Sequence, residues 1–415
     1  MIPLMNLRAL VRKMIYWRES GKYRVTLLSV CPNSSAVLEA AVRCASLHNT
    51  PMLFAASLNA VDRDGGYTTW SPSDFVYQMY NFAHKYTWRG PLYPGLDHCG
   101  PWLKDSHITE NLGYDQAMQE VKLSLSACIQ AGYQLIHIDT TIDRRLPPSQ
   151  TMPVERVAPR TIELIRYAEE VRNRLTLSPV AYAAGSEELH SGLVNFNNFQ
   201  IFLSNLRSGM ASMKLLEAWP AFFVADVGTS LINAFFSPAS ANRVYTATAP
   251  TGALANGHYT DWVDDPTLYP QAGVGCATLG PELTAEEVHA LQALCEHETE
   301  LLSGHPQLSP SNFLETLEQA VIASQCWKKW LAPEEKDKAF ADLELFRQGR
   351  LIESGARYVW TEPGVKAARK KLYENLGSLM TDPQSYVVDR LVRLIEKYIA
   401  AFNLHDLLAR LEEIE

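Results

Sequence analysis

The sequence has 415 residues, 47% of them hydrophobic and 20% charged, which is typical of a globular protein with a large core. The net charge of −9 disfavours nucleic acid and anionic membranes as partners, because no basic stripe can neutralise phosphates. No stretch reaches the roughly 20 apolar residues that span a bilayer. The seven cysteines are scattered without a CxxC pair, so we expect a cytoplasmic protein with reduced thiols.

An amphipathic helix is expected at the N-terminus, and short apolar segments then alternate with helical segments over about 300 residues. The segments expected as strands lie at residues 24–30, 51–56, 90–98, 134–139, 179–184, 221–226 and 272–279, with a weaker one ending near 257–262. Eight strands separated by helices predict a parallel sheet closed into a (β/α)8 TIM barrel. A doubly wound open sheet is the alternative, but no GxGxxG follows the first strand.

Two regions near the end of the barrel have weaker or different signals. The helix expected before the seventh strand is weak, between residues 195 and 250. Thr284 and Glu287 form a potential capping box for a helix that ends near residue 302. From about residue 305 the sequence is helical and rich in charge. We therefore predict a barrel domain at residues 1–305 and a helical C-terminal subdomain at residues 306–415.

Polar residues follow the predicted strands at several ends. They are Asp97 and His98, then Asp139, Glu187, Glu188, Asp226, His258 and Asp261. All strand ends of a barrel face one mouth, so these residues are expected to converge. Two imidazoles with carboxylates suit a divalent metal such as Zn²⁺, Mn²⁺ or Ni²⁺. Asp226 could instead cap a helix, Asp261 could orient His258, and His137 is expected to be a packed core histidine.

Phosphate binding requires backbone amides or a cation at the same mouth. Glycines offer such amides at Gly65-Gly66, Gly228-Thr229 and Gly273-Val274-Gly275, and nearby cations are Lys104, Arg144 and Arg145. Glycine-rich loops are common, so this pattern alone does not identify a phosphate site.

Several motifs resemble one known family. They are Ser29-Val30-Cys31, Asp64-Gly65-Gly66-Tyr67-Thr68, Ser71-Pro72-Ser73-Asp74-Phe75, Asp97-His98-Cys99-Gly100-Pro101, Ile136-His137-Ile138-Asp139, Gly185-Ser186-Glu187, Cys326-Trp327-Lys328-Lys329 and Arg357-Tyr358-Val359-Trp360. Together they resemble the accessory, so-called non-catalytic subunit of class II tagatose-bisphosphate aldolase. The segments at 227–231 and 257–263 resemble ketose 4-epimerases of the same superfamily.

The resemblance implies a barrel, a divalent metal and a ketose or ketose-phosphate ligand. By likeness to class II aldolases, Asp97 is the acid or base and His98 a metal ligand. Glu187 and His258 are candidates for the remaining ligands, and Asp139 could orient substrate hydroxyls. Substrate or phosphate contacts are expected from Gly66, Tyr67, Gly228, Thr229 and Asp261.

The chemistry of C4 inversion restricts the mechanism. The C4 hydrogen of a ketose is β to the C2 carbonyl, so enolisation cannot remove it, and reversible C3–C4 cleavage is the route without a redox cofactor. We therefore predict first a metal-dependent 4-epimerase that interconverts tagatose and fructose, as 6-phosphates or free sugars. The alternatives are an accessory subunit that stabilises a catalytic aldolase, or the bisphosphate aldolase itself. We expect a homo-oligomer, with an aldolase catalytic subunit as a further candidate partner.

Overall fold

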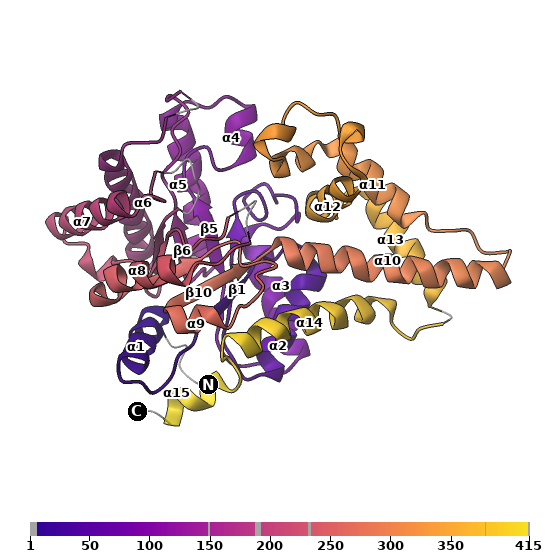
Figure 1. Ribbon diagram of the computed structural model, residues 1–415, viewed down its shortest axis with the longest axis horizontal. Coiled ribbons are helices and arrows are strands. Elements are labelled where there is room, and N and C mark those ends of the chain that lie inside the picture. Colours follow the sequence, from indigo (N-terminus) through magenta and orange to yellow (C-terminus); the bar gives the residue numbers. More distant parts are fainter. Residues whose placement is uncertain (1–5, 148–149, 187–191, 231–233, 378, 414–415) are drawn as a thin grey trace.

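The computed structural model describes residues 6–147, 150–186, 192–230, 234–377 and 379–413. Ten strand segments form one parallel sheet in the order β3-β5-β6-β7-β8-β9-β10-β1-β2-β4. The segments are β1 (Leu27–Val30), β2 (Met52–Phe54), β3 (Ala56–Ser57), β4 (Leu92–Tyr93), β5 (Gly95–Cys99), β6 (Leu135–Ile138), β7 (Ala181–Gly185), β8 (Phe222–Val224), β9 (Leu254–Gly257) and β10 (Val274–Leu279). The sheet lies at the centre of the molecule, surrounded by helices (Figure 1).

The sheet closes because its two terminal segments are halves of neighbouring strands. β2 continues into β3 across Ala55, and β4 continues into β5 across Pro94. β2 pairs with β4 and β3 pairs with β5, so the ring is complete when each interrupted pair counts as one strand. Pro94 has no N–H to donate, but its carbonyl accepts from the Gln134 amide at 2.8 Å. The predicted (β/α)8 barrel is confirmed.

Helices follow most strands, as the sequence predicts. The α-helices are α1 (Leu7–Glu19), α2 (Ser35–Leu47), α3 (Pro72–Lys85), α4 (Asp105–Thr109), α5 (Tyr114–Gln130), α6 (Val154–Arg174), α7 (Phe196–Ser212), α8 (Pro238–Thr248), α9 (Leu268–Ala272), α10 (Pro281–Gly304), α11 (Phe313–Ser324), α12 (Leu345–Gly355), α13 (Pro363–Leu376), α14 (Pro383–Ala401) and α15 (Leu407–Glu413). Among the described residues, no helix has the length and apolar character needed to cross a membrane.

Two local predictions differ from the structure. α8 does form before β9, because Ser237 caps it through the Ser240 amide and Pro238 occupies its first turn. The capping box predicted at Thr284 is wrong, because α10 already begins at Pro281. Glu287 instead accepts a hydrogen bond from the Ser34 hydroxyl at 2.6 Å and links α10 to α2.

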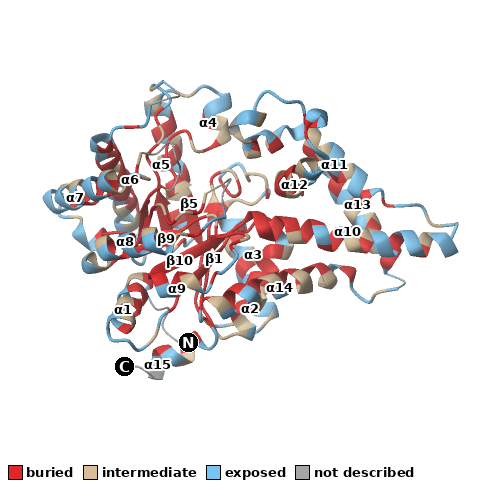
Figure 2. Cartoon of the chain, in the orientation of Figure 1, coloured by how far each residue is buried: buried red, intermediate tan, exposed pale blue. Residues whose placement is uncertain are grey.

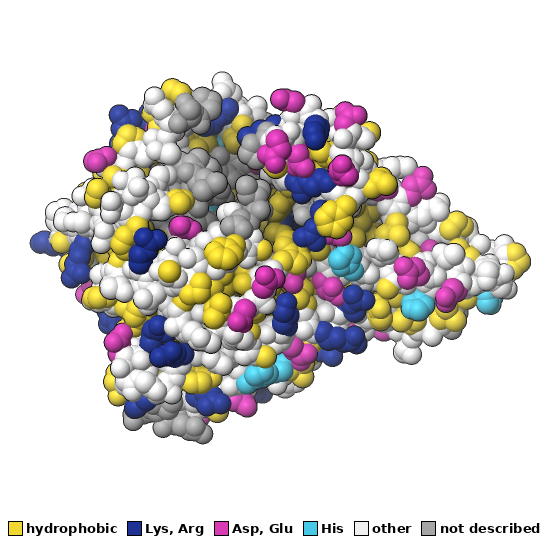
Figure 3. All heavy atoms as spheres, in the orientation of Figure 1, with side chains coloured by type: hydrophobic (Ala, Val, Ile, Leu, Met, Phe, Trp, Pro, Cys, Tyr) yellow, Lys and Arg dark blue, Asp and Glu magenta, His cyan; other side chains and the backbone are white. Residues whose placement is uncertain are grey.

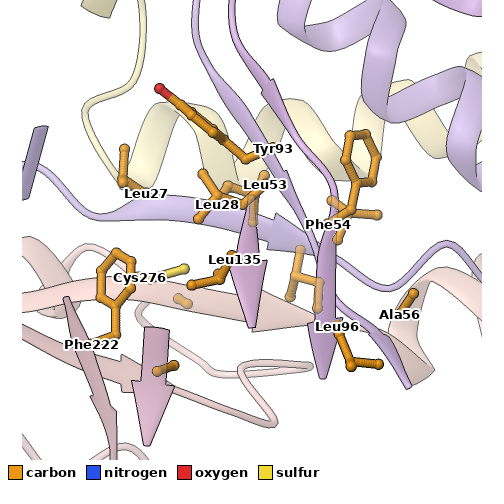
Figure 4. Close-up of a cluster of buried hydrophobic side chains, with 14 of the residues drawn as sticks. Leu27, Leu28, Leu53, Phe54, Ala56, Tyr93, Leu96, Leu135, Phe222 and Cys276 are labelled. Carbon is orange, nitrogen blue, oxygen red and sulfur yellow. The ribbon is translucent and has the colours of Figure 1, made fainter. Parts of the chain in front are cut away.

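One hydrophobic core joins the barrel to the C-terminal helices. Around the barrel sheet, buried side chains from β1, β2, β5, β6, β8 and β10 form part of this cluster (Figure 4). The same cluster extends to Phe313, Trp327 and Val365 beyond the barrel. α14 returns from the C-terminal region and packs along α2 and α10, and Figure 2 shows buried residues on these helices where they face each other. The predicted boundary at residue 305 follows the end of α10, and the division into two domains stays a prediction.

Candidate metal centre

A bulge at the end of β5 turns two consecutive side chains toward the barrel mouth. The pairing of β5 with β6 shifts register between Leu96 and Cys99, and His98 has a φ of 49°. On a regular strand Asp97 and His98 would point to opposite faces. A β-bulge redirects a side chain in this way, often beside a functional site. The Asp-His pair can therefore contribute both of its side chains to one centre.

Four side chains meet at this mouth. Asp97, His98, His137 and His258 each offer a ligand atom, and these atoms all lie within 4.8 Å of one another. Asp97 Oδ1 is 2.8 Å from His137 Nδ1 and 3.6 Å from His258 Nε2. Asp97 Oδ2 is 3.9 Å from His98 Nε2. Ligands of a tetrahedral zinc ion lie about 3.3 Å apart, so small side-chain movements would bring the three imidazoles within reach of one cation and leave its fourth position open.

The hydrogen bonds of His137 test whether this donor set fits a metal. His137 Nε2 lies 3.0 Å from the Gly185 carbonyl, which assigns its proton to Nε2. Nδ1 accepts the His98 amide at 3.2 Å and also faces Asp97 Oδ1. Two acceptor atoms in contact require a proton or a cation between them. A metal-binding imidazole commonly donates its other N–H to a carbonyl, so His137 fits as an Nδ1 ligand.

The other two imidazoles are oriented by buried partners. Asp139 Oδ2 is 3.1 Å from His98 Nδ1, which leaves His98 Nε2 on the side of Asp97. Asp139 is fixed in turn by the amide and hydroxyl of Thr141, at 3.0 and 2.6 Å. His258 Nε2 lies 3.2 Å from the Asn256 side-chain amide. Asp139 thus lies behind His98, in the place of a positioning residue.

The charges of the cluster keep its carboxylates ionised. Burial alone would raise the pKa of Asp97, but the imidazoles of His98, His258 and His137 lower it well below its usual range. Burial likewise opposes ionisation of Asp139, and the contacts with His98 lower its pKa to about 2. In contrast, burial raises the pKa of the Cys99 thiol, which disfavours Cys99 as a nucleophile.

The structure brings some of the predicted site residues together and separates others. Asp97, His98 and His258 meet, whereas Glu187 lies outside the described residues. Tyr67 and Asp261 line the same cavity as the cluster. Gly66, one residue earlier, donates its amide to Asp64 Oδ1 at 3.3 Å.

Two residues of the loop after β8, Gly228 and Thr229, make hydrogen bonds within the protein that the sequence did not indicate. The Gly228 amide donates to Asp226 Oδ1 at 2.8 Å, so this amide is already used within the loop. The Thr229 hydroxyl donates to the His258 carbonyl at 2.6 Å and thereby supports the segment that carries this imidazole. Whether Gly228 and Thr229 contact substrate stays a prediction.

Comparison with known proteins gives the family context. The protein-family profile described as "D-tagatose-1,6-bisphosphate aldolase subunit GatZ/KbaZ-like" matches residues 11–198. A protein of this name, GatZ, from Salmonella dublin is 26% identical over 88% of both chains. GatZ from Klebsiella pneumoniae subsp. pneumoniae is 26% identical over 88% of this chain and 87% of its own. The chain resembles the GatZ/KbaZ-like subunits, as its motifs predict.

The range matched by the family profile includes residues 97, 98 and 137, which are the β5 and β6 residues of the candidate metal centre. His258 falls outside that range. The crystal structure of a probable tagatose 6 phosphate kinase from Sinorhizobium meliloti 1021 has a TM-score of 0.72 and 21% identity, covering 91% of this chain and all of its own. At that identity the similarity supports the fold alone. The likeness to 4-epimerases gains no support from these relatives.

Proposed function

We propose that this chain is an aldolase-type subunit of the GatZ/KbaZ kind that binds a divalent metal and supports reversible C3–C4 cleavage of a ketose phosphate. The observation that carries the proposal is the buried convergence of His98, His137 and His258 on Asp97. The names of the relatives favour the aldolase-subunit function over C4 epimerisation. Zn²⁺, Mn²⁺ and Ni²⁺ all suit imidazole ligands.

The residues of the cluster divide naturally between binding and proton transfer. The three imidazoles would hold the cation, which would polarise the C2 carbonyl. Asp97 is ionised, so it can accept the proton of the C4 hydroxyl. The C3–C4 bond then breaks, its electron pair moves toward the C2 carbonyl oxygen, and C4 becomes an aldehyde. Asp139 keeps His98 in its orientation during these steps.

The test is release of triose phosphates from tagatose 1,6-bisphosphate by the purified chain, before and after chelation. We expect chelation to abolish release and an added divalent ion to restore it. Asp97→Asn preserves the size of the side chain but cannot accept the proton, and should lower turnover by about 10²-fold or more. Asp115→Asn, at an exposed position on α5, is the control. A fully active Asp97→Asn protein would contradict the proposed role of Asp97 as the base.

A second candidate is the 4-epimerase, because the acid-base and metal-binding residues lie in one chain. Re-addition of the aldehyde through its opposite face would invert C4. Conversion of fructose 6-phosphate into tagatose 6-phosphate by the chain alone would support this activity. Absence of both activities, together with a gain in activity of an added aldolase catalytic subunit, would assign an accessory role.

A further inference from the structure

The metal centre opens into a cavity of about 250 Å³ that has two unlike walls. Asp97, His98 and His258 form the barrel wall, and residues of two short 3-10 helices form the other. These helices are η4 (Cys326–Trp330) and η7 (Ala356–Tyr358), which lie in the C-terminal region. The face in Figure 3 is hollowed between the barrel and the C-terminal helices, and basic side chains border this hollow.

Arg357 on η7 is a buried cation that lacks an anion. Its side chain lines the cavity, the residue is 7% exposed, and its Nη2 is buried without a hydrogen-bond partner. Its Nε donates to the Ser354 carbonyl at 3.3 Å. Among the described residues, no carboxylate lies within the 4.0 Å of an ion pair with Arg357. A guanidinium remains charged in proteins, so burying it without an anion is unfavourable.

The neighbours of Arg357 hold it in place without neutralising it. The guanidinium carbon lies 4.8 Å from the Trp330 ring centroid and 5.7 Å from the Tyr358 centroid. The Trp330 indole N–H is also buried without a hydrogen-bond partner, so it is a second unused donor in this wall. Lys329 differs, because its ammonium group pairs with Asp105 of α4. Arg357 is therefore a cation of this cavity that forms no ion pair with any described residue.

A second acidic group, besides Asp97, lines this cavity. Asp261 lines the cavity, and its Oδ1 accepts the amides of Gly280 and Glu282 at 2.9 and 2.8 Å. Its Oδ2 is buried without a partner. Burial raises the pKa of Asp261 to about 7, so near neutrality the carboxyl group can be protonated and can donate to an oxyanion.

We propose that Arg357, assisted by the Trp330 indole, binds the phosphate ester of the substrate on the cavity wall formed by η4 and η7. This inference rests on the proposed function, because it assumes that the sugar part reaches Asp97 and His98. The C-terminal region thereby supplies the specificity for a phosphorylated sugar. Arg suits this task because its planar fork of donors matches the oxygens of a phosphate.

The experiment is calorimetric titration of the metal-loaded full chain with fructose 6-phosphate, fructose and inorganic phosphate. We expect the wild type to bind fructose 6-phosphate at least about tenfold more tightly than fructose. Arg357→Gln should remove this preference, and Arg357→Lys should keep part of it. The matched control is Arg350→Gln, because Arg350 stacks at 4.2 Å on Trp262 but is already paired with Glu353.

A folded Arg357→Gln protein that still prefers fructose 6-phosphate over fructose would overturn the inference, and Arg357→Lys with full wild-type affinity would count against the bidentate contact. If Arg357→Gln does not fold, Trp330→Phe, which removes only the indole donor, should still lower phosphate affinity. Tighter binding of tagaturonate than of fructose 6-phosphate would mean that the site takes a carboxylate, which contradicts the phosphate assignment.

The two proposals can fail separately. Metal-dependent cleavage of tagatose 1,6-bisphosphate without any effect of Arg357→Gln on affinity would refute the phosphate site alone. If the wild type shows Arg357-dependent phosphate binding but no cleavage, and His98→Ala leaves that binding unchanged, the proposed function alone would be refuted.

Discussion

At the scale of single residues, Asp261 is held by two backbone amides yet leaves one carboxylate oxygen buried and unpartnered. A carboxyl group of an unfolded chain titrates near pH 3.9, whereas burial raises the pKa of Asp261 to about 7 in the folded protein. The folded state therefore binds more protons than the unfolded state between these values. Asp261 must destabilise the fold progressively as pH rises through this range.

We expect the Asp261→Asn variant to become more stable relative to wild type as the pH rises from 5 to 7, measured as the difference in their free energies of unfolding. The change should be on the order of 2 kcal/mol and should level off at higher pH. Urea unfolding of the metal-free proteins at a series of pH values measures it. Asp264→Asn, at an exposed position, is the control. A difference that does not vary with pH would contradict the raised pKa.

Individual residues of the candidate site could be predicted where strand ends carry acids or imidazoles, as at Asp97, His98 and His258. His137, which the sequence predicts as a packed core histidine, lies in the cluster and stands two residues before Asp139. Residues two apart on a strand share a face, so this spacing was the available signal. The sequence marks Arg357 only as part of a motif that resembles the family, because the unpartnered Nη2 of its guanidinium is visible only in the packed structure.

At the scale of elements, the chain segments that follow β5 and β6 pack tightly against each other beside the candidate metal centre. A Cβ atom added at Gly100 would lie 1.6 Å from the Asp139 carbonyl oxygen, and the Asp139 amide also donates to the Cys99 carbonyl at 3.0 Å. The Asp139 carbonyl oxygen and the Cys99 carbonyl oxygen both belong to the backbone, so neither can move without displacing the end of its strand. Gly100 thus sets the distance between the segments that carry His98 and Asp139.

Gly100→Ala should lower the free energy of unfolding by at least about 2 kcal/mol, through overpacking between strand ends. It should also weaken metal binding, since Asp139 and His98 would no longer be aligned. Unfolding in urea and titration with Zn²⁺ measure the two effects. Gly349→Ala on α12, where an added Cβ meets nothing within 4 Å, should cause neither. Unchanged metal affinity in a folded Gly100→Ala protein would refute the alignment argument.

The elements themselves were largely predictable, since apolar segments alternating with helices specify a barrel. The bulge in β5 was not, because no glycine marks it and His98 adopts a φ of 49°. The start of α10 was misplaced because Thr284 and Glu287 imitate a capping box, whereas Pro281 begins the helix.

At the scale of the whole molecule, α14 joins the C-terminal region to the barrel. Leu391 on α14 is fully buried, and Arg43 of α2 forms an ion pair with Asp389 at 2.5 Å. Tyr398 also donates to Glu282 of α10 at 2.5 Å. These contacts predict that the barrel and the C-terminal helices unfold together, although the sequence suggests two domains.

Leu391→Ala should lower the free energy of unfolding by about 3 kcal/mol, because it leaves a cavity between α14 and the barrel. Tryptophan fluorescence, to which tryptophans of both the barrel and the C-terminal region contribute, and circular dichroism should give coincident transitions. Lys397→Ala, at an exposed position of α14, should change little. Two separate transitions would show that the C-terminal helices form an independent domain.

The packing of α14 on α2 also bears on how the chain is made. α2 ends at Leu47 and α14 begins at Pro383, so most of the polypeptide is synthesised between them. At typical ribosomal rates this interval is on the order of tens of seconds. During that time the part of α2 that α14 covers in the folded protein remains uncovered. Chaperone dependence in the cell should therefore follow the rate of translation of the final third of the message.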